Sequence, residues 1–144
     1  SSASSAGSDT QATTSDTGSA QALADVKGVT TNAETWSIEI ASPDTGCDQY
    51  ANWWEVVTPE GTLVYRRILA HSHVDEQPFT RTGGPVEVAP SDTVIVRAHM
   101  FPGGYGGQAL RGSIDAGFEL DNTIDATFAP GLAEADPLPD GCAF

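Results

Sequence analysis

Basic side chains are scarce in this chain. Its 144 residues include 20 Asp and Glu but only 6 Lys and Arg, which gives a net charge of −14. Nucleic acids and anionic lipid surfaces are recognised through clustered Lys and Arg. The composition therefore excludes both as partners. Such acidity is typical of a protein that stays soluble in a salty or crowded exterior, or of one that binds a hard cation such as calcium.

Long apolar runs are absent as well. The sequence contains no stretch of about 18 consecutive apolar residues, so it predicts no membrane-spanning helix. The chain begins at Ser1, without an initiator Met or a signal segment. We therefore expect a processed protein that was exported through a removed signal segment and that acts outside the cell or at its surface.

Only two cysteines occur, Cys47 and Cys142, and their spacing fits no zinc or redox motif. In an exported chain the expected outcome is one disulfide, with two free thiols as the alternative. Such a bridge would join the carboxyl end to the loop after the second expected strand. By loop-closure entropy it contributes at most about 4–5 kcal/mol.

Catalytic motifs are missing. There is no Gly-x-Ser-x-Gly elbow, no His-Glu-x-x-His helix and no cysteine free to pair with a histidine. The glycine-rich residues 101–107 lie between two expected strands, whereas a phosphate loop precedes a helix and usually contains Lys. We interpret them as a flexible turn that carries one exposed aromatic, and we expect a protein that is not an enzyme.

Large side chains are missing from residues 1–19, where eleven of the positions are Ser or Thr. Such a segment cannot bury enough apolar surface to offset an ordering entropy of about 1–2 kcal/mol per residue. Order there requires a companion: the chain's own domain, a neighbouring copy, or covalently attached sugar. We assign residues 1–20 to an extended arm and residues 21–144 to a single domain.

Small residues in the arm leave room for O-linked glycans, as in Ser/Thr-rich stalks. The predicted attachment points are Ser4, Ser5, Ser8, Thr10, Thr13, Thr14, Ser15 and Thr17. None of Asn32, Asn52 or Asn122 lies in an Asn-x-Ser/Thr sequon, so the sequence does not predict glycans on asparagine.

Strand patterns dominate the rest of the chain. Apolar residues alternate with polar ones over residues 36–40, and residues 52–58 and 62–70 flank Pro59-Glu60-Gly61 as a hairpin. The other expected strands are residues 86–88, 93–100, 109–114 and 118–120, with residues 123–128 as a candidate edge strand. Because no helical period occurs, the pattern predicts an all-β fold, an antiparallel β-sandwich of the immunoglobulin-like or jelly-roll class.

The expected hairpin is apolar on both faces. Trp54 and Val56 project to one side, while Trp53 and Val57 project to the other. A small sandwich covers only one of these sides. The second cover is either the long loops with the disulfide-linked carboxyl end, or a partner subunit or bound carbohydrate.

A further strand is expected over residues 20–30, where small apolar residues recur at every second position. Its inward face consists of Ala20, Ala22, Ala24 and Val26. The strand either begins the chain's own sandwich or pairs with the open sheet edge of a neighbour. The preceding 19 residues, fully extended, span about 60 Å, enough to cross an adjacent subunit. We therefore predict an intersubunit contact through this strand.

An arm followed by a β-sandwich resembles the extracellular filament subunits that polymerise by donor-strand exchange, the pilin-like sandwiches. The resemblance covers the arm at residues 1–30 and the sandwich after it. It implies a structural, non-enzymatic subunit whose partners are copies of itself, since forward-reaching contacts continue into a fibre. This arm is richer in Ser and Thr, and poorer in large aliphatic residues, than a typical donor strand.

Two groups of side chains are candidate metal ligands. His71 and His73 share one face of an extended segment, and His99 can join them to hold zinc or copper. The alternative is hydrogen bonding that orders the loop. Carboxylates close in sequence supply oxygen ligands for calcium, with a solvated acidic surface as the alternative. These acids are Asp115, Glu119, Asp121 and Asp125.

The second functional hypothesis is a secreted or surface-tethered module that binds carbohydrate or metal. Carbohydrate is recognised on flat aromatic surfaces flanked by polar groups. The residues that could offer such surfaces on a sandwich are Trp53 or Trp54, with Tyr65 and Tyr105.

Overall fold

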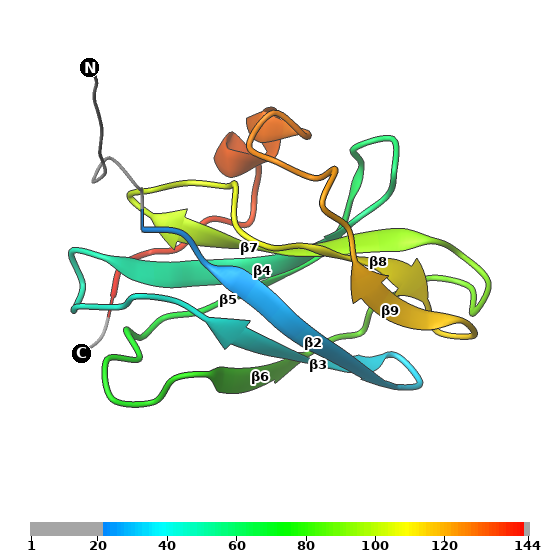
Figure 1. The fold of residues 1–144 in the computed structure, drawn as a ribbon, viewed down its shortest axis with the longest axis horizontal. Coiled ribbons are helices and arrows are strands. Elements are labelled where there is room, and N and C mark those ends of the chain that lie inside the picture. Colours follow the sequence, from blue (N-terminus) through cyan, green and yellow to red (C-terminus); the bar gives the residue numbers. More distant parts are fainter. Residues whose placement is uncertain (1–21, 143–144) are drawn as a thin grey trace, which may run out of the picture.

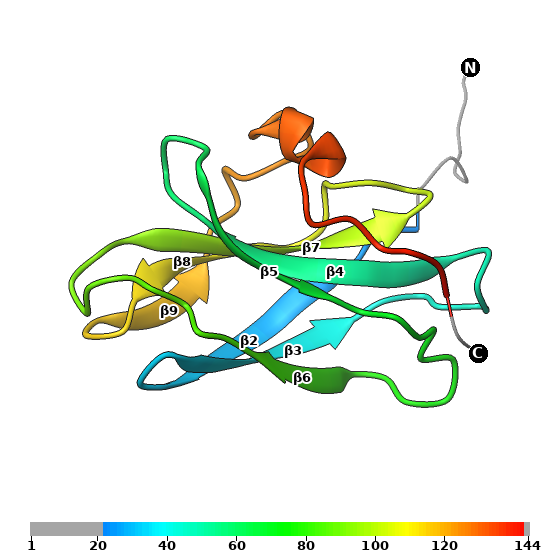
Figure 2. The ribbon, with the colours of Figure 1, turned by 180° about the vertical axis from the view of Figure 1, so that it is seen from behind.

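The structure, a computed structural model, describes residues 22–142 and consists of two antiparallel sheets packed face to face (Figures 1 and 2). One sheet has the order β2-β3-β6, built from β2 (Asp25–Asn32), β3 (Thr35–Ala41) and β6 (Phe79–Gly83). The other has the order β5-β4-β7-β8-β9, built from β4 (Tyr50–Val57), β5 (Leu63–Ile68), β7 (Val94–Phe101), β8 (Leu110–Ser113) and β9 (Gly117–Leu120). A short 3-10 helix, η2 (Pro130–Glu134), follows. The predicted all-β sandwich is confirmed.

Two expected strands are absent, and one strand was not predicted. Residues 86–88 are not a strand, because Pro85 and Pro90 flank them and cannot donate to a ladder. Residues 123–128 form turns in which the Asp125 carboxylate accepts hydrogen bonds from Thr127. The unpredicted β6 buries only Phe79 well, so its sequence lacks an apolar alternation.

The first strand belongs to the chain's own sandwich. β2 pairs antiparallel with β3, from Asp25 opposite Ala41 to Asn32 opposite Thr35. Ala24 and Val26 are 1% and 0% exposed in the core, and Ala22 packs against that core. Ala22, Ala24 and Val26 thus fill the space between the two sheets of their own chain, and the predicted intersubunit contact through this strand stays a prediction. Ala20 and the eight predicted glycosylation sites lie outside the described residues.

The core lies between the inner faces of the two sheets. Its large side chains come from alternate positions of facing strands, as the period-two patterns predict. Burying each of them stabilises the fold by about 1.5–3 kcal/mol. The largest members are Trp36, Ile38, Ile40, Trp54, Leu69, Phe79, Met100 and Leu110.

The carboxyl-terminal segment covers part of the outer face of the five-stranded sheet. We call residues 128–142 the strap; Figures 1 and 2 show η2 and the residues after it running over β7 and β4. Cys142, at its end, forms the predicted disulfide with Cys47. Of the two covers expected for the second apolar face, the structure shows the disulfide-linked carboxyl end.

Within residues 22–142, no helix has the length and apolar character needed to cross a membrane.

Candidate functional site

A buried charge ladder lies beneath the strap, on the outer face of the five-stranded sheet. Sheet register places Glu55 of β4 between Arg66 of β5 and Arg97 of β7. The Glu55 Oε1 atom accepts from Arg66 Nε at 2.8 Å, and Oε2 accepts from Arg97 Nε at 2.8 Å. All three residues are at most 5% exposed. One carboxylate thus sits between two guanidinium groups, each of which keeps donors free for other partners.

Those remaining donors hold the strap by its backbone. Arg66 donates to the carbonyl oxygens of Leu132, Ala135 and Pro137. Arg97 donates to the carbonyl oxygens of Phe128 and Ala129. The strap is held mainly through its carbonyl oxygens, and one of its side chains adds a contact with the same layer: the Arg97 guanidinium lies 5.3 Å from the ring centroid of Phe128.

Aromatic rings continue the same layer toward the end of the sandwich. The Arg66 guanidinium lies 4.1 Å from the ring centroid of Trp53, and that of Arg97 lies 3.5 Å from the centroid of Tyr105. The imidazole of His99 stacks on Trp53, with centroids 3.9 Å apart and planes 6° apart. Cation-π and stacking contacts therefore hold these planar groups in one layer.

A β-bulge turns Asn52 toward His99. The β4–β7 register shifts between Ala51 and Trp53, so Asn52 is the extra residue. Its Oδ1 atom lies 2.7 Å from His99 Nδ1. An amide oxygen only accepts, so Nδ1 of His99 carries the proton and Nε2 keeps its lone pair. Burial, followed by the charges of Arg66 and Arg97, lowers the pKa of His99 to about 4, so the ring is neutral at neutral pH.

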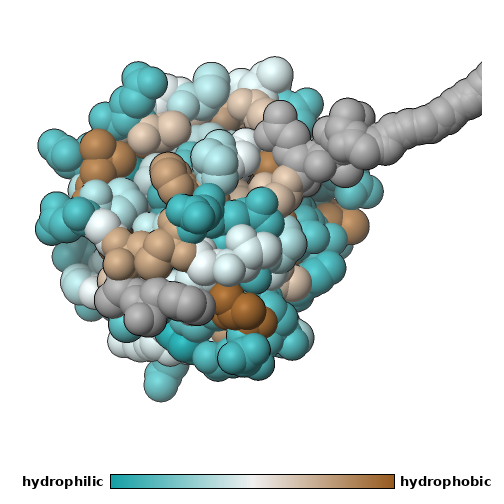
Figure 3. All heavy atoms as spheres, turned by 90° about the vertical axis from the view of Figure 1, so that its left-hand side faces the viewer, coloured by the Kyte–Doolittle hydropathy of each residue, from teal (hydrophilic) through white to brown (hydrophobic). Residues whose placement is uncertain are grey.

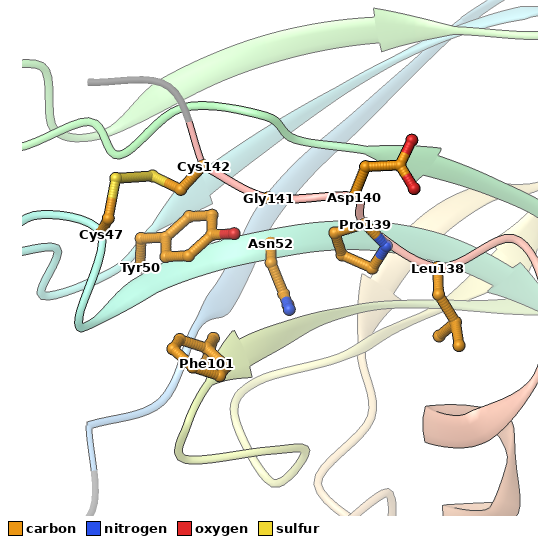
Figure 4. A pocket seen from close by; sticks show the side chains of 9 residues that line it. All are labelled: Cys47, Tyr50, Asn52, Phe101, Leu138, Pro139, Asp140, Gly141 and Cys142. Carbon is orange, nitrogen blue, oxygen red and sulfur yellow. A yellow bond between two sulfur atoms is a disulfide. The ribbon is translucent and has the colours of Figure 1, made fainter.

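A groove of about 530 Å³ opens between the end of the sandwich and the end of the strap (Figure 4). Tyr50 and Asn52 from β4 and Phe101 from β7 form one wall. Residues 138–142 form the other wall, with the disulfide at one end and Leu138 at the other. Figure 3 looks onto this end of the molecule, where apolar residues lie among hydrophilic ones. We refer to this space as the groove.

The lining of the groove combines apolar surface with a few polar groups. Phe101 and Leu138 are large apolar side chains that are 45% and 41% exposed. The ring of Tyr50 packs edge-on to Phe101 at 6.0 Å. Burial, and then the charge of Asp44, raise the pKa of the Tyr50 hydroxyl, so it stays protonated. The Asn52 amide and the Asp140 carboxylate add hydrogen-bonding capacity. Such a lining suits a ligand with an apolar face and polar edges.

The aromatic residues expected to stack on carbohydrate are mostly inside the protein. Trp53, Trp54 and Tyr105 are 2%, 0% and 7% exposed, and Tyr65 packs against the core. That expectation is corrected, because both faces of the hairpin are covered. Phe101, from the glycine-rich turn expected to carry one exposed aromatic, offers its ring instead.

The three histidines do not form a metal site. His73 stacks on Phe79 at 3.9 Å, with its Nδ1 atom 3.9 Å from Asp44, whereas His99 stacks on Trp53. Burial first, and then the charge of Arg81, lower the pKa of His73. His71 is exposed. In the part of the chain that the structure describes, no group of three or more His, Cys, Asp or Glu could hold a metal ion.

The candidate calcium ligands either accept hydrogen bonds from other groups of the chain or lie apart on the surface. Asp121 accepts hydrogen bonds from Thr123 and Arg111, which lower its pKa to about 2. Asp115 and Glu119 are exposed, with Glu119 opposite Arg111 in the β8–β9 pair. The arrangement matches the alternative, a solvated acidic surface.

Comparison with known proteins gives one informative similarity. A protein of Halomicrobium mukohataei named "Putative lipoprotein" is 43% identical over 79 residues, which are 54% of this chain and 38% of that protein. The chain therefore covers well under half the length of this relative. No protein-family model matches the chain, and no solved structure gives a significant match.

Proposed function

We propose that this chain is the β-sandwich module of an exported, surface-tethered protein, and that it binds carbohydrate in the groove without catalysing a reaction. Similarity to a protein named as a lipoprotein supports a lipid-anchored location at the cell surface. The Ser/Thr-rich residues 1–19 have the composition of a spacer between an anchor and a folded module. The net charge of −14 suits exposure to the exterior.

One observation carries the binding proposal: the half-exposed ring of Phe101 lines the same groove as Tyr50 and Asn52. A pyranose ring has an apolar C–H face that packs on an aromatic ring, and it has hydroxyl groups at its edges. The Tyr50 hydroxyl and the Asn52 amide line the same groove as the Phe101 ring, and they supply hydrogen-bonding groups for the sugar hydroxyls (Figure 4). Phe101 and Leu138 are both large, exposed and apolar, and they line the groove together with polar groups, an arrangement typical of a ligand-binding groove.

A glycan array tests the proposal directly. The wild-type chain binds a subset of neutral glycans, and Phe101→Ala loses at least tenfold in affinity because the stacking surface is gone. Leu120→Ala is the matched control: Leu120 is 49% exposed, but it lies on β9, outside the groove. Equal loss in both variants, or wild-type binding that Phe101→Ala leaves unchanged, would refute the groove as the site.

The location is tested separately from binding. Native protein from the source cells should partition into the detergent phase of a Triton X-114 extract and carry a lipid mass at its amino-terminal end. Recovery of the unmodified chain from the medium alone would contradict the tether. Mass spectrometry of peptides that cover residues 1–20 tests the predicted O-linked glycans, because each attached sugar adds its mass to the peptide.

A second candidate function is a structural filament subunit that exchanges β2 between copies. It is favoured by the position of β2, which lies at the edge of its sheet and is separated from the Ser/Thr-rich residues 1–19 by five residues. A β2 strand from a neighbour would make the same contacts in trans.

Two residues that face each other in the β2–β3 ladder can show whether β2 pairs within its own chain or with a neighbouring copy. Thr30 lies opposite Ser37 in the β2–β3 ladder. Oxidised Thr30→Cys/Ser37→Cys protein gives a ladder of covalent oligomers if β2 is exchanged, and a monomer if it is not. Negatively stained native material would show filaments in the first case and dispersed particles in the second.

A further inference from the structure

A second cavity, of about 560 Å³, lies beside the glycine-rich turn that follows β7. We call it the hollow. Its lining combines the ring of His99 with the turn itself and with small residues that precede the strap or lie in it. The lining includes His99, Gly103, Tyr105, Asp125, Ala126 and Pro130. The hydrogen bond from His99 to Asn52 connects the floor of the hollow with the wall of the groove.

The imidazole of His99 is held on three sides. Trp53 stacks on it at 3.9 Å, Tyr105 packs edge-on at 4.7 Å, and Asn52 fixes Nδ1. His99 lines the hollow, and with Nδ1 taken by Asn52 the ring nitrogen left for a ligand is Nε2. Since Nδ1 carries the proton, Nε2 presents a lone pair in a fixed direction. The site is therefore a preorganised hydrogen-bond acceptor.

The charges around the hollow restrict what can bind there. The guanidinium groups of Arg66 and Arg97 are close enough to disfavour a proton on His99, and they disfavour a metal ion at Nε2 for the same reason. Asp125 lines the hollow as a carboxylate whose pKa is lowered by hydrogen bonds from Thr127. It repels anions and accepts hydrogen bonds. The two guanidinium groups oppose a cation and the Asp125 carboxylate opposes an anion, so the two acceptors favour a neutral ligand that is rich in hydroxyl donors.

We propose that the hollow is a second subsite for a neutral sugar or polyol, in which a ligand hydroxyl donates a hydrogen bond to Nε2 of His99. The inference rests on the proposed carbohydrate-binding function and extends it from stacking on Phe101 to a defined polar contact. The turn leaves space for such a ligand. Gly104 has a φ of +89°, which favours glycine, and a Cβ at this residue would meet no atom within 4 Å, so the hollow is open there.

Imidazole ¹⁵N NMR of the full chain at neutral pH tests this subsite. The probes are three pyranosides of one scaffold: methyl glucoside, methyl glucuronide and methyl glucosaminide. We expect the neutral glucoside to move the Nε2 resonance of His99 upfield and to leave those of His71 and His73 in place. The anionic and cationic probes should move it less.

Two outcomes overturn the subsite. One is a His99 Nε2 resonance that stays fixed up to the solubility limit of the neutral glucoside. The other is a larger response to zinc or to a charged probe than to the neutral one. Phe101→Ala separates this inference from the groove: glycan binding that depends on Phe101 with an unmoved His99 signal refutes the subsite alone. A moved signal in a chain whose array binding ignores Phe101 refutes the groove alone.

Discussion

The two faces of the five-stranded sheet are stabilised by different interactions. The inner face packs Trp54, Val56 and Val96 against the other sheet and contributes through apolar burial. The outer face carries Glu55 with Arg66 and Arg97 under a strap held by its carbonyl groups. Apolar packing tolerates substitutions of similar volume, whereas a buried charge network fails when one member is lost. The outer face is therefore the more fragile of the two, and it adjoins the proposed binding site.

The largest effect should come from cutting the covalent end of the strap. Cys47→Ser/Cys142→Ser opens a loop of 95 residues, which costs at most about 4–5 kcal/mol by loop-closure entropy. Urea unfolding measures the loss, and limited proteolysis should cut first within residues 128–142. If cleavage began in β2 or β3 instead, the strap would not be the weak side of the molecule.

The next effect comes from the centre of the charge ladder. Glu55→Gln leaves two buried guanidinium groups without a counter-charge and should cost about 3–5 kcal/mol in the free energy of unfolding. The measurement is again the urea midpoint at constant m-value. A loss below about 1 kcal/mol would mean that water reaches the ladder and that the outer face resembles an ordinary surface.

Acid should destabilise the protein through His99, which lies on the outer face of the five-stranded sheet. The folded-state pKa of His99, about 4, is below its ordinary value of 6.5, so the folded chain binds fewer protons than the unfolded chain. Its contribution is fully present above pH 6.5 and is lost as the pH falls toward 4, by about 2–3 kcal/mol. His99→Gln should flatten the stability profile in this window, leaving the smaller slope of His73, whose pKa is also lowered. An unchanged profile would contradict a neutral, half-buried imidazole.

The smallest effect should come from an exposed ion pair that belongs to neither face of the five-stranded sheet. Arg81 and Glu76 lie 3.0 Å apart, but they are exposed, so water and salt screen their attraction. Glu76→Gln removes one carboxylate charge, as Glu55→Gln does, and its urea midpoint should be indistinguishable from that of the wild type. A shift comparable to that of Glu55→Gln would show that burial is not what distinguishes the two pairs.

The sequence predicted the sandwich because period-two patterns are local. It also indicated that the sheet needs a second cover, because Trp53 and Trp54 are adjacent and point to opposite faces. The charge ladder escaped prediction: Glu55 and its two partners lie 11 and 42 residues apart, and only sheet register brings them together. Cys142 marked the end of the strap in the sequence, but the path before it could not be predicted because carbonyl groups, which every residue has, make most of its contacts.

The site was predictable to a similar degree. The turn at residues 101–107 was expected to expose one aromatic, and Phe101 is half-exposed there. The pairing of His99 with Asn52 depends on a bulge between Ala51 and Trp53, for which the sequence carries no local signal. His71, His73 and His99 suggested a metal site only because sequence spacing does not show which sheet a side chain packs against.

Chemical-shift mapping of the full chain against the best glycan from the array tests the central claim most directly. Amide resonances of Tyr50, Asn52, Phe101 and Leu138 should move together, with saturation at one affinity, while those of the β2-β3-β6 sheet stay fixed. Shifts confined to that sheet, or no shift for any glycan on the array, would contradict a carbohydrate-binding groove at this end of the sandwich.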